Sequence, residues 1–521
     1  MRYVWLLLLT MGLADIGSAF AAGVLRRGAF GEPESLQPNQ SGVASEQVIL
    51  RDLFEGLTTF DPAGTVIPGV AESWTVSADG LRYRFKLRPA LRWSDGAALK
   101  AADFVYAFRR TLTPSTTAAR ASRLFVLRNA VAVHDGTLPP AQLGVSAPDD
   151  RTVLIELEHP LPSLPLLLAG EEGYPLPQQV VDRAGATWTR PGTMVSNGAF
   201  VLAERRPRGV VRLTRNRNFH EATGVSLDQV DYLPSDDTVS LVNRFRAGEL
   251  EINGWPGFAA ARQAPLRQEL GNAVHVTPLV SVRYLRFNIR RPPFDDVRVR
   301  EALSLAVDRD LLVARVMPGG ERASFRVVPA GLSDDQPPRD NPLQNGNAAA
   351  RLARARALLA QTAWHSPGRP LRLRAPSGNG EQLCLAVIAM WKLAGVNVVL
   401  EQSEIKSMIA DMRKGDFDIA LTGAQDVPSY EAYLERFRRG AYNNTGGYAN
   451  STFDAALDRA GMRVDSKQRA AALAQAEAIL IADHAIVPLI QEVARSLVAP
   501  RVLGWVDNPY DIHLSRWLGV K

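Results

Sequence analysis

The pattern of apolar and polar residues predicts strands and helices that alternate along the chain. Residues 81–88 alternate strictly between apolar and basic side chains, which predicts a strand with one buried and one exposed face. Such half-buried strands are typical of antiparallel sheets. Residues 101–110 instead space Phe104, Ala107 and Phe108 at helical intervals, so this segment is predicted to be an amphipathic helix.

The second half of the sequence shows the same mixture. Asp296 is placed to cap a helix, which we predict to run to about Met317 before a Pro-Gly-Gly sequence. Residues 371–373, 382–393 and 396–400 then follow the order strand, helix, strand. This order is typical of a crossover unit in a partly parallel sheet, and the predicted fold class is therefore α/β.

The N-terminal residues have the pattern of an export signal. Arg2 is followed by an apolar run over residues 3–13, and Ala19 and Ala21 form an Ala-x-Ala cleavage pattern. The run is shorter than the roughly 20 apolar residues that a membrane span needs. We therefore predict that residues 1–22 are a cleavable signal peptide.

Composition limits the kind of protein further. The 521 residues are 46% hydrophobic and 22% charged, as expected for a folded chain of about three domains' length. The net charge of +6 comes from interleaved acids and bases, which gives no indication of nucleic-acid binding. Cys384 is the only cysteine, so the chain can form no internal disulfide and has no cysteine near the cleavage site to carry a lipid. These features predict an exported, unlipidated protein in the periplasm of a Gram-negative bacterium.

Catalytic and cofactor motifs are scarce. The seven histidines show no metal-ligand spacing, and the sequence contains no G-x-S-x-G, Walker or G-x-G-x-x-G motif, so we expect no cofactor. Ser403 and Lys406 do match S-x-x-K, the nucleophile motif of penicillin-interacting serine enzymes, but the K-[ST]-G partner motif is missing. The other interpretation of these two residues is a solvated helix start.

Several longer motifs follow one another in order. They are DLFEGL at 52–57, PGVAESW at 68–74, WSDG at 93–96, MVSNGAF at 194–200, PFDDVRVREAL at 293–303 and MRKGDFD at 412–418. With these motifs the chain resembles the periplasmic oligopeptide-binding proteins of ABC importers, solute-binding protein family 5. The resemblance covers nearly the whole chain that follows the predicted signal peptide.

The resemblance implies a two-lobed periplasmic-binding-protein clamp of type II with an additional third domain. The expected parts are lobe I at 23–54, 184–278 and 490–521, the additional domain II at 55–183, and lobe III at 279–489. Residues 274–278 and 486–490 are short apolar stretches that suit two strands crossing between the lobes as hinges.

In this family the peptide lies extended in the cleft and pairs its backbone with strands of the protein, and an Asp contacts its free ammonium group. Residues 424–434 place that Asp at Asp426, and the strand before it supplies Thr422, Gly423 and Ala424. Tyr448 matches a cleft tyrosine and Asn253 a backbone-contacting asparagine. Other interpretations are a turn at Asp426 and packing roles for Tyr448 and Asn253.

The sequence also departs from its peptide-binding relatives. Ile405 and Gly423 stand where these carry Trp, and Met412 and Ala420 stand where they carry Arg. These losses suggest a different ligand length or shape. Arg120 replaces a cleft Tyr and could receive an acidic group of the ligand; the other interpretation is a surface Arg or one paired with a protein carboxylate.

The predicted function is capture of oligopeptides in the cleft and their delivery to the permease subunits of an ABC importer, without catalysis. The expected protein is a monomer whose partners are the peptide and, transiently, the permease. Alternatives are a binder of murein peptides or another non-standard ligand in the same fold, a sensor or chaperone for exposed peptide segments, and the serine enzyme at Ser403 and Lys406.

Overall fold

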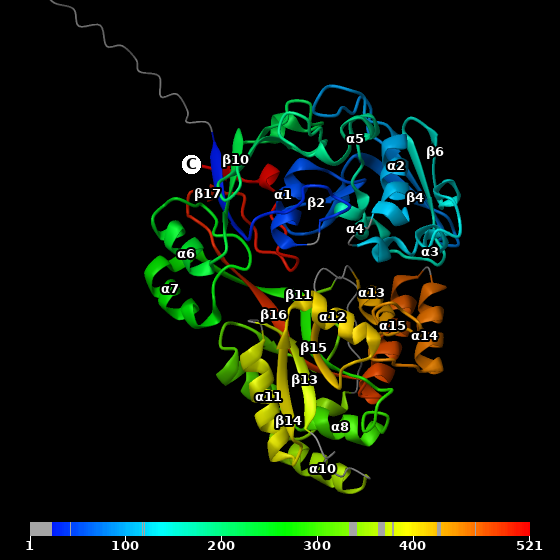
Figure 1. Ribbon diagram of the computed structural model, residues 1–521, viewed down its shortest axis with the longest axis vertical. Helices are drawn as coiled ribbons and strands as arrows, with labels where there is room; N and C mark the ends of the chain where they lie inside the picture. Colours follow the sequence, from blue (N-terminus) through cyan, green and yellow to red (C-terminus); the bar gives the residue numbers. More distant parts are fainter. Residues whose placement is uncertain are drawn as a thin grey trace, which may run out of the picture.

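The structure, a computed structural model, is a mixed α/β protein with three large sheets (Figure 1). It describes residues 23–41, 43–116, 118, 120–332, 341–362, 370–377, 380–424, 429–463 and 465–521. We call the part built on two four-stranded sheets the upper half and the part built on a six-stranded sheet the lower half, as they stand in Figure 1. The predicted signal peptide lies outside the described residues.

The two sheets of the upper half have different topologies. One has the strand order β1 (Val24–Phe30), β10 (Gln229–Ser235), β9 (Val211–Arg215) and β8 (Phe200–Arg205), with only the β1–β10 pair parallel. The other is antiparallel throughout and has the order β4 (Ala71–Val76), β5 (Arg82–Leu87), β7 (Thr152–Glu156) and β6 (Val145–Asp149). Exposed and buried residues alternate strictly along β5, which confirms the strand predicted from its sequence pattern.

The lower half contains the six-stranded mixed sheet. Its order is β12 (Arg322–Ala323), β16 (Ile486–Leu497), β11 (Val274–Phe287), β15 (Ile419–Ala424), β13 (Leu371–Pro376) and β14 (Val398–Ser403). Strand β13 runs parallel to β14 and β15, and α11 (Glu381–Leu393) connects β13 to β14. The predicted crossover unit is thus confirmed. The upper half also contains two small antiparallel sheets. One pairs β2 (Thr58–Phe60) with β3 (Val66–Pro68), and the other pairs β17 (Val502–Leu503) with β18 (Gly519–Val520).

Helices cover the sheets of both halves. Those of the upper half are α1 (Ala44–Leu53), α2 (Ala101–Leu112), α3 (Ala130–His134), α4 (Leu164–Leu167), α5 (Gln178–Ala184), α6 (Thr238–Arg246) and α7 (Gln263–Leu270). Those of the lower half, besides α11, are α8 (Val297–Leu305), α9 (Arg309–Leu311), α10 (Ala348–Ala360), α12 (Ile405–Lys414), α13 (Tyr430–Glu435), α14 (Ser451–Gly461) and α15 (Ser466–Ala482).

The helix predicted from Asp296 to about Met317 is only partly correct. Asp296 does cap α8, because its carboxylate accepts a hydrogen bond from the Arg298 amide at 2.8 Å. The helix ends at Leu305, however, and Asp308 begins a second helical segment by accepting from the Leu311 amide at 3.2 Å. A second capping residue inside the apolar pattern therefore divides the predicted helix.

Strands β11 and β16 connect the two halves. They are long, lie side by side and run from the upper half into the lower half (Figure 1). Their antiparallel pairing extends from Val274 opposite Leu497 to Arg286 opposite Ile486, and its register shifts between Pro278 and Val282. Both segments predicted to cross between lobes lie in these strands.

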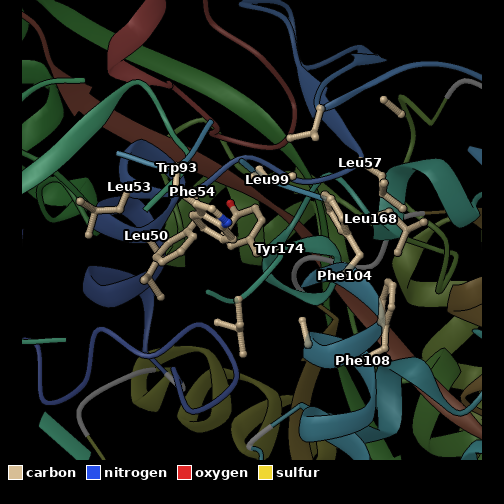
Figure 2. Close-up of a cluster of buried hydrophobic side chains, with 14 of the residues drawn as sticks. Leu50, Leu53, Phe54, Leu57, Trp93, Leu99, Phe104, Phe108, Leu168 and Tyr174 are labelled. Atoms are coloured by element: carbon tan, nitrogen blue, oxygen red, sulfur yellow. The ribbon is translucent and has the colours of Figure 1, made fainter. Parts of the chain in front are cut away.

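The core of the upper half fixes α1 in place. Leu50, Leu53 and Phe54 at the C-terminal end of α1 are buried among aromatic side chains from distant parts of the chain (Figure 2). The Phe54 ring stacks on Tyr174 with 5.9 Å between ring centroids. The side of α1 that carries Leu50 and Leu53 is packed in this core. The side that carries Gln47 and Arg51 therefore faces the cavity near the lower half.

Candidate ligand-binding cleft

A cavity of about 100 Å³ lies where α1 meets β11. It is lined by Gln47, Val48 and Arg51 of α1, by Trp255, by Leu279, Val280 and Ser281 of β11, and by Pro509, Tyr510 and Asp511. A second cavity of about 40 Å³ shares Val48, Trp255 and Asp511 with it. The two cavities therefore form one cleft, bounded by a helix of the upper half and by a strand that crosses between the halves.

The upper wall of the cleft carries positive charge. Gln47 and Arg51 are one helical turn apart on α1, so their side chains lie on the same face. The Gln47 side-chain oxygen, in the orientation that its surroundings require, accepts a hydrogen bond from Nη1 of Arg120 at 2.8 Å. Arg120, which we predicted to lie in the cleft, thus lies directly behind Gln47.

The positive charges of Arg120 and Arg51 both act on the carboxyl group of Glu171. Glu171 is buried, and its Oε2 accepts a hydrogen bond from the Ser41 hydroxyl at 2.7 Å. Burial raises the pKa of Glu171 to about 7, although the positive charges of Arg120 and Arg51 act in the opposite direction. The adjacent Glu172 instead pairs with Arg123 at 3.0 Å.

An ion pair lies beside Ser281, a lining residue of the cavity, and we call Ser281 with this pair the floor of the cleft. The Ser281 hydroxyl donates to Oε2 of Glu492 at 2.6 Å, and Nε of Arg283 donates to Oε1 at 2.8 Å. The side chains of Arg283 and Glu492 are only 15% and 17% exposed. Each charge is therefore matched within the protein, and this part of the floor is rigid and close to neutral.

Trp255 and Asp511 complete the walls. The Trp255 side chain is 45% exposed and contacts Phe30 edge to face, with 6.3 Å between ring centroids. Asp511 has a left-handed backbone conformation with φ of 53°, and its Oδ1 lies 3.2 Å from Nε2 of His513. The cleft thus combines an exposed aromatic surface with charged groups at defined positions.

The predicted ligand-contacting residues of β15 lie beside this floor. Thr422, Gly423 and Ala424 pair with Tyr284, Arg283 and Val282 of β11. The pairing of β15 with β13, in contrast, involves only Ile419 and Ala420. Within the described residues, the β13 side of residues 422–424 therefore has no strand partner. Asp426 lies outside the described residues.

The other two predicted contacts make hydrogen bonds within the protein. Asn253 is fully buried, and its Oδ1 accepts from the Leu497 amide at 2.8 Å, while its Nδ2 has no partner among the described residues. Tyr448 is 5% exposed, and its hydroxyl donates to Oδ2 of Asp483 at 2.7 Å. None of the predicted contacts among the described residues lines the two cavities. Arg120 is hydrogen-bonded to the lining residue Gln47, and Ala424 pairs with Val282, which follows the lining residue Ser281.

The alternative enzyme motif falls at a strand-to-helix junction. Ser403 is the last residue of β14, and its hydroxyl is buried without a hydrogen-bond partner among the described residues. Lys406 is exposed in the first turn of α12, where Glu404 accepts hydrogen bonds from the amides of Lys406 and Ser407. This arrangement is that of a capped helix start.

No group of three or more His, Cys, Asp and Glu side chains among the described residues is arranged to hold a metal ion. No helix in the described ranges is both long and apolar enough to span a membrane.

The sequence pattern did not predict Arg51 and Trp255, which line the cleft, or Arg283 and Glu492, which adjoin its lining residue Ser281. Arg51 lies on the polar face of an amphipathic helix, which a sequence pattern assigns to solvent. Arg283 and Glu492 are 209 residues apart and meet only because β11 and β16 pair. The only signal at Trp255 was an aromatic residue between Gly254 and Pro256, in a segment without helical or strand periodicity.

The chain is similar to proteins of known type over nearly its whole length. Residues 65–445 match the family model for bacterial extracellular solute-binding proteins, family 5 middle. The probable deoxycholate-binding periplasmic protein YgiS of Escherichia coli is 33% identical over 508 residues, which are 96% of this chain and 94% of that protein. The periplasmic oligopeptide-binding protein OppA of the same organism is 34% identical over 496 residues, 92% of this chain and 90% of that protein. The solved structure of the Escherichia coli murein tripeptide binding protein MppA superposes with a TM-score of 0.84 at 31% identity, covering 96% of this chain and 98% of that one.

These similarities confirm the predicted fold class, an α/β two-lobed clamp of periplasmic-binding-protein type II with an additional domain. The cleft itself lies where the two halves meet at the connecting strands. The chain belongs to the bacterial extracellular solute-binding proteins of family 5.

Proposed function

We propose that this protein binds a peptide in the cleft between α1 and β11 and delivers it, chemically unchanged, to the permease of an ABC importer. The observation that carries the proposal is that residues 422–424 on β15, next to the cleft floor, have no strand partner on their β13 side within the described part of the chain. An extended peptide can add to such a side as an extra strand, because its backbone groups match those of the unpaired strand. Backbone pairing of this kind accepts many peptide sequences.

Three further residues have proposed roles in the same site. Asp426 follows β15 by two residues and would pair with the ammonium group of the peptide. The unpartnered Nδ2 of Asn253 could donate to the peptide backbone if closure of the lobes brings the two together. Tyr448 would have to exchange its hydrogen bond to Asp483 for one to the ligand, or else support the cleft from behind.

The cellular location, the oligomeric state and the domain division are proposals as well. Relatives named periplasmic support a periplasmic location, with residues 1–22 removed as a signal peptide and no lipid attached. We expect a monomer that contacts the permease only transiently. The proposed division is lobe I at 23–54, 184–278 and 490–521, domain II at 55–183, and lobe III at 279–489. Strands β11 and β16 would then be the hinge.

Native mass spectrometry of protein isolated without denaturation tests the function. Co-purified peptides that are released on denaturation, and that rebind in calorimetry, are the expected result. Murein tripeptide and deoxycholate, named in the descriptions of relatives, serve as comparison ligands. Binding of deoxycholate alone, with no peptide bound at any length tested, would contradict the proposal.

The absence of catalysis has its own test. A fluorescent penicillin should not label the protein, since Ser403 is buried at the end of β14 and Lys406 points from an exposed helix start. Covalent labelling that is lost in Ser403→Ala would instead support the serine-enzyme alternative.

A further inference from the structure

Arg51 is a charged group of the cleft for which the described residues supply no ion-pair partner. It lines the cavity from α1, and its Nε is buried without a hydrogen-bond partner. Within the described residues its guanidinium forms no ion pair within 4 Å. Of the other charged groups, Glu492 is paired with Arg283, and Arg27 in the second cavity donates to the His513 carbonyl at 2.8 Å and to the Ser515 hydroxyl at 2.9 Å. Asp511 lies 3.2 Å from a ring nitrogen of His513.

The surroundings of Arg51 add positive charge. Arg120 lies behind Gln47, one helical turn from Arg51, and both arginines act on the single carboxyl group of Glu171. Glu171 is itself held by Ser41, and burial opposes its ionisation. The charges of Arg51 and Arg120 thus both act on Glu171, whose ionisation is opposed by burial. A cation held in such a poorly hydrated site is stabilised when an anion joins it.

The rest of the cavity is suited to the body of a carboxylate-bearing ligand. Val48, Leu279, Val280 and Tyr510 supply apolar surface, and Trp255 supplies an exposed ring. Gln47 adjoins Arg51 and offers a neutral amide for a second hydrogen bond. A guanidinium can hold a carboxylate through two parallel hydrogen bonds, which fixes both its position and its orientation.

We propose that Arg51 receives a carboxylate of the bound ligand, with Gln47 beside it and with Arg120 as a positioning residue behind Gln47. The inference rests on the proposed peptide-binding function and adds a substrate class, namely peptides with an acidic side chain or a free C-terminus at this point of the cleft. Arg120 thus contributes charge without being the direct contact. The same chemistry would hold the carboxylate of a sterol acid such as deoxycholate.

Calorimetry on the full chain with matched ligands tests this assignment. Two peptide pairs are used, one differing as Glu against Gln in a side chain and one as free acid against amide at the C-terminus, and deoxycholate is a third probe. The unchanged protein should prefer the acid form of at least one pair. Arg51→Gln should lose about tenfold or more in affinity for that acid form and little for its neutral partner. Arg51→Lys should retain part of the preference, because it keeps the charge but not the paired hydrogen bonds.

Arg84→Gln is the matched control, since it removes an arginine from the exposed face of β5. An acid preference that is equal in Arg51→Gln and the unchanged protein would overturn the inference and leave peptide binding intact. A lower thermal stability of Arg51→Gln without a change in preference would show that Arg51 only supports the C-terminal end of α1.

The same experiment separates this inference from the peptide-binding proposal. If no peptide binds, that proposal fails, and the role of Arg51 is decided by deoxycholate. Deoxycholate binding that is weakened in Arg51→Gln but not in Arg84→Gln would support Arg51 as the carboxylate contact. Deoxycholate binding that is equal in all variants, or absent, would overturn it.

Discussion

Arg283 on β11 and Glu492 on β16 form an ion pair across the two strands that connect the halves of the protein, with 2.8 Å between Nε and Oε1. Ser281 holds the second carboxylate oxygen at 2.6 Å. Arg283 pairs with Gly423 of β15, in the segment 422–424 that has no strand partner on its β13 side among the described residues. The ion pair therefore links the proposed hinge strands to the surface on which a peptide would lie.

The first prediction concerns the energy of this pair. Removing either charge leaves the other in a largely desolvated position, so Glu492→Gln and Arg283→Met should each destabilise the protein by about 1 to 3 kcal/mol. The double variant should lose less than the sum, which gives a coupling energy of about 1 kcal/mol or more. The coupling energy is measured by urea unfolding of the unchanged protein, the two single variants and the double variant. A coupling energy within about 0.3 kcal/mol of zero would show that the pair contributes nothing.

The second prediction concerns Asp426. If its carboxylate pairs with the peptide ammonium, Asp426→Asn should weaken peptide binding by about 2 to 4 kcal/mol, because the buried ammonium loses its counter-charge. N-acetylation of the peptide should weaken binding to the unchanged protein for the same reason. Calorimetry measures both effects, with Asp236→Asn at an exposed position as the control. Equal affinity for acetylated and free peptide would contradict the role of Asp426 as the contact of the ammonium group.

The third prediction concerns pH and Glu171. Its carboxyl group has an ordinary pKa of 4.5 and a pKa of about 7 in the folded protein, because burial opposes its ionisation. Between these values the folded state holds a proton that the unfolded state has lost. The free energy of unfolding therefore falls as pH rises through this interval, by at most about 1.4 kcal/mol per pH unit.

Glu171→Gln should remove this dependence, since the amide stays neutral and can still accept the Ser41 hydrogen bond. Its stability relative to the unchanged protein should rise between about pH 5 and pH 7.5. Denaturant unfolding at both pH values measures the difference, with Glu381→Gln at an exposed position of α11 as the control. A difference that does not change with pH would mean that Glu171 ionises normally in the folded state.

The elements that could be predicted from the sequence are those governed by local patterns. The alternation along β5 and the strand, helix, strand order of β13, α11 and β14 follow from side-chain periodicity, and both are confirmed. The helix after Asp296 was predicted too long, because the cap at Asp308 lies within an uninterrupted apolar pattern. The local sequence pattern thus predicts the presence of a helix or strand more reliably than the residue at which it ends.

The cleft could be predicted only in part. The resemblance to peptide-binding relatives predicts ligand contacts at residues 422–424 of β15 and at Arg120, and both stay predictions. Residues 422–424 pair with β11, and Arg120 is hydrogen-bonded to the lining residue Gln47. The resemblance did not locate Arg51, because the polar face of α1 becomes a cleft wall only when β11 packs near it, more than 200 residues further along the chain. The packing of the two halves against each other decides which polar residues face a cleft and which face open solvent.

The last prediction uses Trp255 as a reporter of ligand binding. Its side chain is 45% exposed, lines both cavities and contacts Phe30, so a ligand in the cleft should displace water from the indole ring. Binding should shift or quench the tryptophan emission, and Trp255→Phe should abolish most of that change while calorimetry still detects binding. Trp74→Phe is the control, because Trp74 lies on β4 against Phe85, in the sheet formed by β4 to β7. If the emission change persists in Trp255→Phe and disappears in a variant of another tryptophan, the ligand occupies a different part of the protein, and the cleft between α1 and β11 is not the binding site.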